Sequence, residues 1–232
     1  MDSEFHLRHN FADSERLANA LADDVSANLI RAIEVRGEAV LALSGGSTPK
    51  RFFNVLASRD VAWAKVTLTL VDERWVPAND DRSNEKLVRD TLMQGEAANA
   101  HFVGLYLNSE TPDQAIARLS TMIPKIIDVA VLGMGADGHT ASFFPGGDNL
   151  AAATSANNPN TVSSMRARGA GEPRITLTLS KLLSAGSIYL HLEGQKKADV
   201  LSAAFNAGPV DDLPIRAMIH QNQRPITIFW AP

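Results

Sequence analysis

The residues of this chain best suited to catalysis are Asp137 and His139, which stand two positions apart in a glycine-rich segment. A run of aliphatic residues from 126 to 132 precedes them and predicts a buried strand. Open α/β sheets place their ligands at loops that follow the carboxyl ends of such strands. A histidine there can exchange protons near neutral pH, and an adjacent aspartate can fix its tautomer. We therefore expect proton transfer at His139, the alternative being two polar residues of an ordinary turn.

A second glycine-rich segment, residues 44–49, falls between a predicted strand and a predicted helix. Gly45 and Gly46 let the backbone approach a ligand closely, and the first turn of the helix offers unpaired N–H groups. Ser47 and Thr48 add hydroxyl donors. The segment has neither the Gly-Lys-Ser/Thr ending of a P-loop nor the Gly-x-Gly-x-x-Gly pattern of dinucleotide-binding loops. It predicts binding of a phosphate or sugar phosphate, and a plain capped turn is the alternative.

Charged side chains stand at the boundaries of three further predicted elements. Asp72 and Arg74 follow a predicted strand directly, Arg174 begins another, and Lys197 lies just inside a predicted helix. An acid and a base at one strand end are suited to binding hydroxyls and an anion, respectively. Because parallel strands bring distant loops to one edge of a sheet, Arg174 and Lys197 are candidates for a positive pocket there. The alternative is that each is an ordinary surface charge.

Strand and helix patterns alternate along the chain. Asp13 is a predicted helix cap, aliphatic residues then recur every four positions, and Gly37 is the predicted helix end. This alternation predicts an α/β fold with a largely parallel β-sheet flanked by helices on both faces, in a three-layer, Rossmann-like arrangement. Since no linker or repeat is visible, residues 1–232 are predicted to form a single domain. The predicted strands are 39–43, 66–71, 102–107, 126–132, 174–179, 187–192 and 225–230, and residues 72–77 and 151–164 are predicted loops.

Composition restricts the classes of protein. The chain has 232 residues with 45% hydrophobic residues and a formal net charge of −4, which supplies a sizeable core and argues against a general nucleic-acid binder. The absence of cysteine excludes disulfides, thiolate nucleophiles and thiolate metal sites. The first residues lack the apolar run of a signal peptide, and no apolar run reaches membrane-spanning length. We therefore expect a cytoplasmic protein without nucleic-acid or membrane partners.

Taken together and in this order, the segments closely resemble those of the glucosamine-6-phosphate isomerase/6-phosphogluconolactonase family. The likeness runs from residue 11 to residue 230, and its glycine-rich stretch with Asp137 and His139 is highly specific. The matching stretches are Leu-Ser-Gly-Gly-Ser-Thr-Pro at 43–49, Leu-Val-Asp-Glu-Arg-Trp-Val-Pro at 70–77, Asp-Arg-Ser-Asn at 81–84, Leu-Gly-Met-Gly-Ala-Asp-Gly-His-Thr-Ala-Ser-Phe-Phe-Pro at 132–145, Arg-Ile-Thr-Leu-Thr at 174–178 and Gly-Gln-Lys-Lys at 194–197.

The resemblance implies hydrolysis of 6-phospho-D-glucono-1,5-lactone to 6-phosphogluconate, the second step of the pentose phosphate pathway. The expected partner is this small-molecule lactone, with no cofactor and no metal, and the expected state is a monomer or small homo-oligomer. A δ-lactone is an activated ester, so a general base that delivers water suffices. The expected roles are His139 as the base, Asp137 orienting it or shaping its loop, Asp72 binding sugar hydroxyls, Arg74 meeting either the phosphate or the lactone carbonyl, and Gly45, Gly46, Ser47, Thr48, Arg174 and Lys197 holding the 6-phosphate.

Other activities remain as alternatives. Deaminase members of the family share two of the loops, but their third typically reads Asp-Glu-Tyr, whereas Arg74 follows Asp-Glu here, as in the lactonases. A sugar-phosphate-sensing regulator would need a DNA-binding module, for which the expected domain leaves no room. The Gly-x-Ser-x-Gly elbow of serine hydrolases is absent, and His139 has no second histidine at metal-ligand spacing. The other histidines are expected to be surface or structural residues, with only His220 considered near the pocket: His6, His9, His101, His191 and His220.

Overall fold

The computed structural model describes residues 5–108 and 110–232, and within them the chain forms a seven-stranded main sheet and a three-stranded second sheet. The main sheet has the order β1 (Leu7–Asn10), β10 (Thr227–Ala231), β9 (Ser187–Glu193), β6 (Val129–Leu132), β2 (Ala39–Leu43), β3 (Val66–Leu70) and β5 (His101–Val103). The second sheet has the order β4 (Asp72–Arg74), β8 (Arg174–Leu177) and β7 (Val162–Met165). The helices are α1 (Ser14–Arg36), α2 (Lys50–Ala57), α3 (Asn84–Thr91), α4 (Pro112–Met122), α5 (Leu150–Ala153), α6 (Leu179–Leu183), α7 (Gln195–Ala204) and α8 (Arg216–Ile219), with short 3-10 helices at Trp63–Lys65 and Gly95–Asn99.

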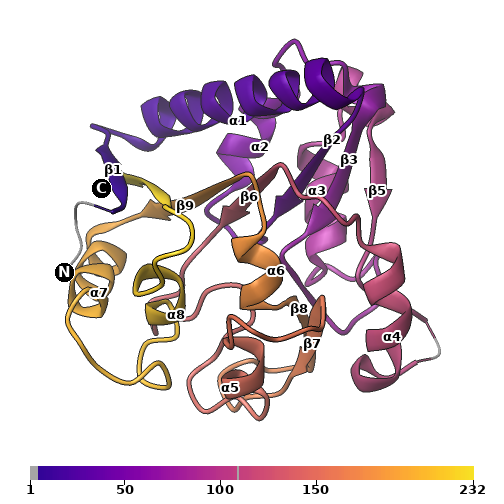
Figure 1. Ribbon diagram of the computed structural model, residues 1–232. Helices are drawn as coiled ribbons and strands as arrows, with labels where there is room; N and C mark the ends of the chain where they lie inside the picture. The colour runs from indigo at the N-terminus through magenta and orange to yellow at the C-terminus, as the bar shows by residue number, and fades with distance from the viewer. Residues whose placement is uncertain (1–4, 109) are drawn as a thin grey trace.

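The main sheet is the middle layer of the molecule. Its neighbouring strands all pair in parallel, and the central strands β2 and β6 are buried along their whole length. Figure 1 shows α1 and α2 above this sheet and α6 and α7 below it. A parallel sheet covered on both faces needs strands of continuous apolar residues, as β2 and β6 have. The predicted α/β class, with a largely parallel sheet between helices, is confirmed.

The longest helix, α1, forms where the sequence predicts it. The Asp13 carboxylate accepts a hydrogen bond from the Arg16 amide at 2.8 Å and so caps the first turn. The face that includes Leu21 and Leu29 is fully buried. Gly37 ends the helix with φ at 84°, a left-handed conformation that glycine adopts without steric cost. Among the described residues, no helix has both the length and the apolarity that a membrane span requires.

The order of the main sheet reverses at β2. The strands β3 and β5 lie on one side of it, and β6, β9 and β10 lie on the other. Where the strand order reverses, the connections from two neighbouring strands leave in opposite directions. A crevice opens between these connections at the carboxyl ends of the two strands. Here these are β2 and β6, so the glycine-rich segments 44–49 and 133–139 lie side by side. The amide of Ser44, the first residue after β2, donates to the carbonyl of Val131 in β6 at 3.0 Å.

The second sheet was not expected from the sequence. The prediction of a charged loop at residues 72–77 is wrong in part, because Asp72–Arg74 forms β4, separated from β3 by Val71 alone. β8 pairs with β4 and β7 in antiparallel directions, so Arg174 is not on a parallel strand. In this register Arg74 stands directly opposite Arg174. The polar stretch 151–164, predicted as a loop, contains most of α5 and the first part of β7.

Three predicted strands are shorter in the structure by more than one residue. The strand predicted at 126–132 begins at Val129, and Ile126 is 53% exposed. The strand predicted at 102–107 is His101–Val103, since Gly104 follows and lies against the carboxylate of Glu85. The strand predicted at 174–179 ends at Leu177, because the next threonine caps α6. The edge strand β1 was not predicted.

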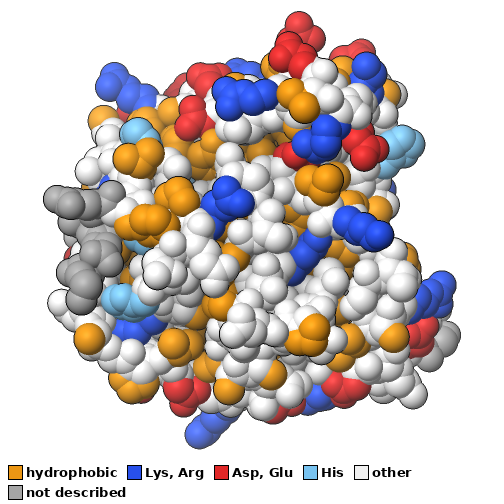
Figure 2. Space-filling model, viewed as in Figure 1, with side chains coloured by type: hydrophobic (Ala, Val, Ile, Leu, Met, Phe, Trp, Pro, Cys, Tyr) orange, Lys and Arg blue, Asp and Glu red, His pale blue; other side chains and the backbone are white. Residues whose placement is uncertain are grey.

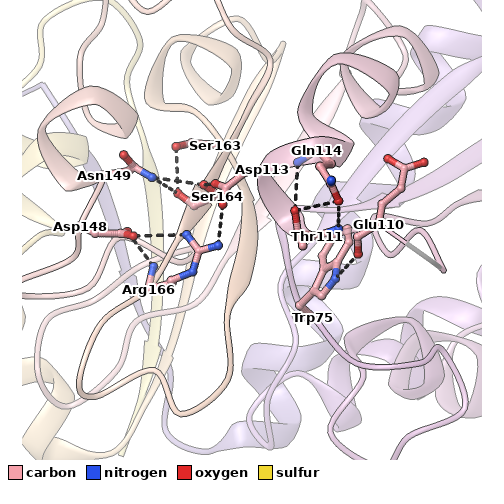
Figure 3. A network of polar contacts seen from close by, with 10 residues as sticks. All are labelled: Trp75, Glu110, Thr111, Asp113, Gln114, Asp148, Asn149, Ser163, Ser164 and Arg166. Atoms are coloured by element: carbon pink, nitrogen blue, oxygen red, sulfur yellow. Dashed lines mark hydrogen bonds and ion pairs between the residues drawn. The ribbon is translucent and has the colours of Figure 1, made fainter.

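The second sheet is fixed to α4 by polar contacts (Figure 3). Arg166, which follows β7, forms ion pairs with Asp113 of α4 at 2.6 Å and with Asp148 at 3.4 Å. Trp75, which follows β4, donates through Nε1 to the carbonyl of Glu110 at 3.0 Å. The residues that follow β4 and β7 are therefore tied to the start of α4 and to the segment just before it.

Candidate active site

A cavity of about 300 Å³ opens at the carboxyl ends of β2 and β6 and is closed on one side by the second sheet. Its wall combines three glycine-rich or charged segments that lie far apart in the sequence. Lys and Arg side chains (blue) lie around the central part of the face drawn in Figure 2. Nine of the ten residues predicted from the sequence line this cavity: Gly45, Gly46, Ser47, Thr48, Asp72, Arg74, His139, Arg174 and Lys197.

The tenth predicted residue, Asp137, lies next to the His139 ring. Its Oδ1 is 2.5 Å from Nδ1 of His139 and also accepts the His139 amide at 3.2 Å. The hydrogen bond from His139 lowers the pKa of the Asp137 carboxyl below its ordinary value, so the carboxylate is ionised at neutral pH and can only accept. Nδ1 therefore carries the proton in the neutral ring, and Nε2 has the lone pair that can take one. A side chain at Gly135 would not fit, since its Cβ would lie 2.3 Å from the His139 ring.

Phe144 joins the histidine to an arginine. Its ring stacks on the His139 ring with centroids 4.4 Å apart and planes inclined by 28°. The Arg174 guanidinium carbon lies 5.4 Å from the centroid of the same ring. One aromatic ring thus limits the movement of both the candidate base and a candidate anion-binding group.

Arg174 and Arg74 make one side of the cavity strongly cationic. Arg174 is 8% exposed, and its Nη2 donates to the carbonyl of Ala170 at 2.6 Å. Burial lowers the pKa of the Arg174 guanidinium, while the nearby Asp72 carboxylate acts in the opposite direction. Arg74 is its direct cross-strand neighbour, and like charges in that position repel. An anion bound between them would relieve this repulsion.

Lys197 forms a further cationic part of the wall together with the loop after β2. Its Nζ donates to Oγ1 of Thr48 at 3.1 Å. Burial lowers the pKa of the Lys197 ammonium, and the charge of Glu193 acts in the opposite direction. The ammonium and the hydroxyl are thus already held together at the N-terminal side of α2, where helix amides also favour an anion.

Asp72 is buried where the loops of the two sheets meet. Its Oδ2 accepts a hydrogen bond from the Ser142 hydroxyl at 2.5 Å, which connects the His139 loop to β4. Its carbonyl accepts Nδ2 of Asn84 at 2.8 Å. The Asn84 side chain also lies against Gly45, where a Cβ atom would come within 1.8 Å of its Oδ1. Gly45 is therefore required by this close approach.

The residues that line the cavity but were not predicted as site residues include Asn84, Phe144 and His191. Asn84 and Phe144 lie inside stretches that resemble the family. They were not selected as site residues because their side chains are uncharged. His191 is 2% exposed and contacts Glu193 at 3.1 Å, as expected of a structural residue, yet it reaches the cavity. His220 instead contacts the carbonyl of Ala204.

No group of three or more His, Asp or Glu side chains within residues 5–108 and 110–232 is arranged to hold a metal ion. What the cavity offers instead is a histidine with a defined tautomer, one buried carboxylate and three cations. This set can remove a proton from water or a substrate hydroxyl and can bind a small anion.

Comparison with known proteins gives a consistent result. The family model described as glucosamine-6-phosphate isomerases/6-phosphogluconolactonase matches residues 12–230. The chain is 52% identical over 227 residues to a protein of Rhizobium meliloti (strain 1021) named 6-phosphogluconolactonase, covering 97% of this chain and 98% of the relative. A protein of the same name from Mesorhizobium japonicum is 47% identical, with 96% and 94% covered. The crystal structure of a 6-phosphogluconolactonase from Shewanella baltica OS155 superposes with a TM-score of 0.92 at 39% identity, with 98% of each chain covered.

Proposed function

The chain belongs to the glucosamine-6-phosphate isomerase/6-phosphogluconolactonase family, and we propose that it hydrolyses 6-phospho-D-glucono-1,5-lactone to 6-phosphogluconate. The names of its relatives support the substrate. The observation that carries the proposal is the position of His139, held at Nδ1 by Asp137, on the wall of a cavity rich in cations. Such a cavity suits a phosphorylated molecule that must be attacked by water.

In the proposed reaction, Nε2 of neutral His139 takes a proton from a water molecule as its oxygen bonds to C1 of the lactone. The carbonyl becomes tetrahedral, and the bond from C1 to the ring oxygen then breaks. The imidazolium returns its proton to the departing ring oxygen, so the histidine ends neutral and the ring is open. Asp137 stabilises the imidazolium during this sequence, because its carboxylate stays ionised beside Nδ1.

The remaining groups hold the substrate in this proposal. Arg174, Lys197 and the Ser47–Thr48 end of the glycine-rich loop bind the 6-phosphate, because a dianion is best met by cations and helix-end amides. Asp72, with one oxygen occupied by Ser142, accepts from sugar hydroxyls through its remaining lone pairs. The cytoplasmic location and the monomeric or small homo-oligomeric state remain predictions from the sequence.

The test is a rapid assay of the purified protein on freshly prepared 6-phosphogluconolactone, with glucosamine 6-phosphate measured in parallel. The lactone opens spontaneously, so the same reaction without protein serves as the blank. We expect fast lactone hydrolysis and no ammonia release. Ammonia release from glucosamine 6-phosphate without lactone hydrolysis would replace this function with that of the deaminases.

A further inference from the structure

Glu73 is a buried carboxylate for which the proposed reaction has no use. It is 0% exposed, and its oxygens accept four hydrogen bonds. Oε1 accepts the amides of Arg74 at 2.7 Å and Asn84 at 2.8 Å, and Oε2 accepts the Ser83 hydroxyl at 2.9 Å and the Glu85 amide at 2.8 Å. All four partners are donors, which matches an ionised, acceptor-only carboxylate. Burial nonetheless raises the pKa of Glu73, so the site is maintained at an electrostatic cost.

The position of Glu73 in β4 separates it from the cavity. Successive side chains of a strand point to opposite faces. Asp72 and Arg74 line the cavity, and Glu73 between them points away from it to the first turn of α3. The helix N-terminus favours a negative charge there. One strand of three residues thus presents two side chains to the cavity and anchors itself by the third.

The first residue of α3 extends this anchor to the glycine-rich loop. Asn84 donates one hydrogen bond from its backbone amide to Glu73 and another from Nδ2 to the carbonyl of Asp72. Its Oδ1 lies close to Gly45. The position of α3 therefore sets how the loop of residues 44–48 lies relative to β4. These are the two segments that carry Thr48 on one side of the cavity and Arg74 on the other.

We propose that Glu73 is a positioning residue, which joins β4 to the N-terminus of α3 and, through Asn84, fixes the distance between the glycine-rich loop and the Asp72–Arg74 strand. This inference rests on the proposed function for its kinetic consequence, but not for its structural one. Small displacements of binding groups are costly to catalysis, and a misplacement of about 1 Å lowers rates by up to about 100-fold.

The experiment compares Glu73→Gln with Asp128→Asn. Asp128 is a matched control, because its carboxylate is also largely buried, at 10% exposed, and also accepts a backbone amide, that of Val40, at 2.8 Å; it pairs with Arg36. It lies just before β6, at the amino-terminal ends of the strands, whereas the cavity lies at their carboxyl ends. The measurements are the thermal unfolding midpoint, amide hydrogen exchange of the peptides that contain residues 44–48 and 72–74, binding of 6-phosphogluconate by calorimetry, and kcat/KM for the lactone. Kinetics and binding are measured well below both midpoints.

Both substitutions are expected to lower the unfolding midpoint. Only Glu73→Gln should speed exchange in the two cavity peptides, weaken product binding and lower kcat/KM by about 100-fold. Equal exchange, binding and turnover in the two variants would make Glu73 a structural residue and overturn the proposal. If the wild type binds product but opens no lactone, the proposed function fails while the exchange data still decide the role of Glu73.

Ser83→Ala is a second variant that keeps the buried carboxylate. It removes one of the four hydrogen bonds to Glu73 and also the cap that the Ser83 hydroxyl gives to the Lys86 amide at the start of α3. It is expected to give a smaller change in the same direction in the exchange of residues 44–48. If Glu73→Gln does not fold, Ser83→Ala decides alone, and wild-type exchange in both cavity peptides would overturn the proposal.

Discussion

His139 is the residue on which the proposed chemistry depends, because its ring lies on the cavity wall with Nδ1 held by the Asp137 carboxylate, which leaves Nε2 to accept a proton. His139→Asn should lower kcat by about 10²–10⁴, the usual effect of losing a general base. Product binding should be nearly unchanged, since the phosphate groups remain. Steady-state kinetics after subtraction of spontaneous hydrolysis, with calorimetry on 6-phosphogluconate, measure the two effects. Near wild-type turnover in the folded variant would leave positioning alone as the means of catalysis.

Arg174 should distinguish phosphorylated from unphosphorylated substrates. The Arg174→Ala protein should lose about 1.5–3 kcal/mol of transition-state stabilisation for 6-phosphogluconolactone, the magnitude of a charge-assisted hydrogen bond. Its kcat/KM for unphosphorylated gluconolactone should change far less. The ratio of the two values is the measurement, because any general disturbance of the stacked Phe144 ring cancels in it. An equal loss on both substrates would remove Arg174 from the phosphate site.

The burial of Lys197 predicts how the affinity for 6-phosphogluconate depends on pH. Burial lowers the pKa of its ammonium, so in the free protein it loses its proton at a lower pH than an exposed lysine does. The affinity for 6-phosphogluconate should therefore weaken as pH rises through this lowered pKa, below the ordinary value of 10.5. Calorimetry with the stable product avoids alkaline opening of the lactone. Lys197→Gln should bind weakly at neutral pH and lose the alkaline decline, and a decline that persists would point to another group.

At the scale of elements, the main sheet was predictable except for its edge strand β1, whereas only β8 of the second sheet was predicted as a strand. β2 and β6 are continuous apolar runs between helices with clear caps at Asp13 and Thr111, so local signals agree with the fold. β4 has three residues, all charged, and its neighbours in the second sheet are distant in sequence. Nothing local to Asp72–Arg74 specifies a strand, because its pairing partner β8 lies about a hundred residues further along the chain.

The residues of the candidate site were likewise only partly predictable from the sequence. The loops after β2 and β6 were found because each combines glycines with hydroxyl or proton-exchanging side chains directly after an apolar strand, where α/β sheets bind ligands. Asp72, Arg74 and Arg174 were found from their charges, although Asp72 and Arg74 were assigned to a loop, and the strand of Arg174 was predicted without its antiparallel pairing in a second sheet. Asn84 and Phe144 act by shape and contact with other site residues, and such roles appear only once the chain is folded.

The contacts that tie the second sheet to α4 should contribute little to stability. Arg166 and Asp113 are about half exposed, and the ion pair lowers the pKa of the Asp113 carboxyl. Exposed pairs stabilise a protein by about 0.2–1 kcal/mol, so Arg166→Gln should lower the free energy of unfolding by no more than that. Chemical denaturation at neutral pH, in low and high salt, is the measurement. The difference from wild type should shrink in high salt, and a salt-independent loss would mean that packing of the arginine stem matters more than its charge.

At the scale of the whole molecule, a net negative protein contains a cationic cavity. The formal net charge is −4, yet Arg74, Arg174 and Lys197 gather around one small volume. The KM for 6-phosphogluconolactone should rise as salt increases from about 0.01 to about 1 M, over which the screening length falls from about 30 to about 3 Å. Unphosphorylated gluconolactone is the control and should show no such rise. If the KM values for both substrates rose equally with salt, the cause would be a general effect of salt on the protein and not screening of the phosphate.

The pairing of β1 with β10 has a consequence for biosynthesis. β1 lies at the edge of the main sheet, is exposed along its length, and pairs there with β10, the last strand in the chain. On a ribosome that adds about 5–20 residues per second, Leu7–Asn10 must wait on the order of ten seconds or more for its partner to appear. The other strands can assemble in the meantime, so β1 is expected to dock last although it is made first. Cleavage before Thr227 would then remove β10 and leave β1, still joined to α1, without the strand with which it pairs.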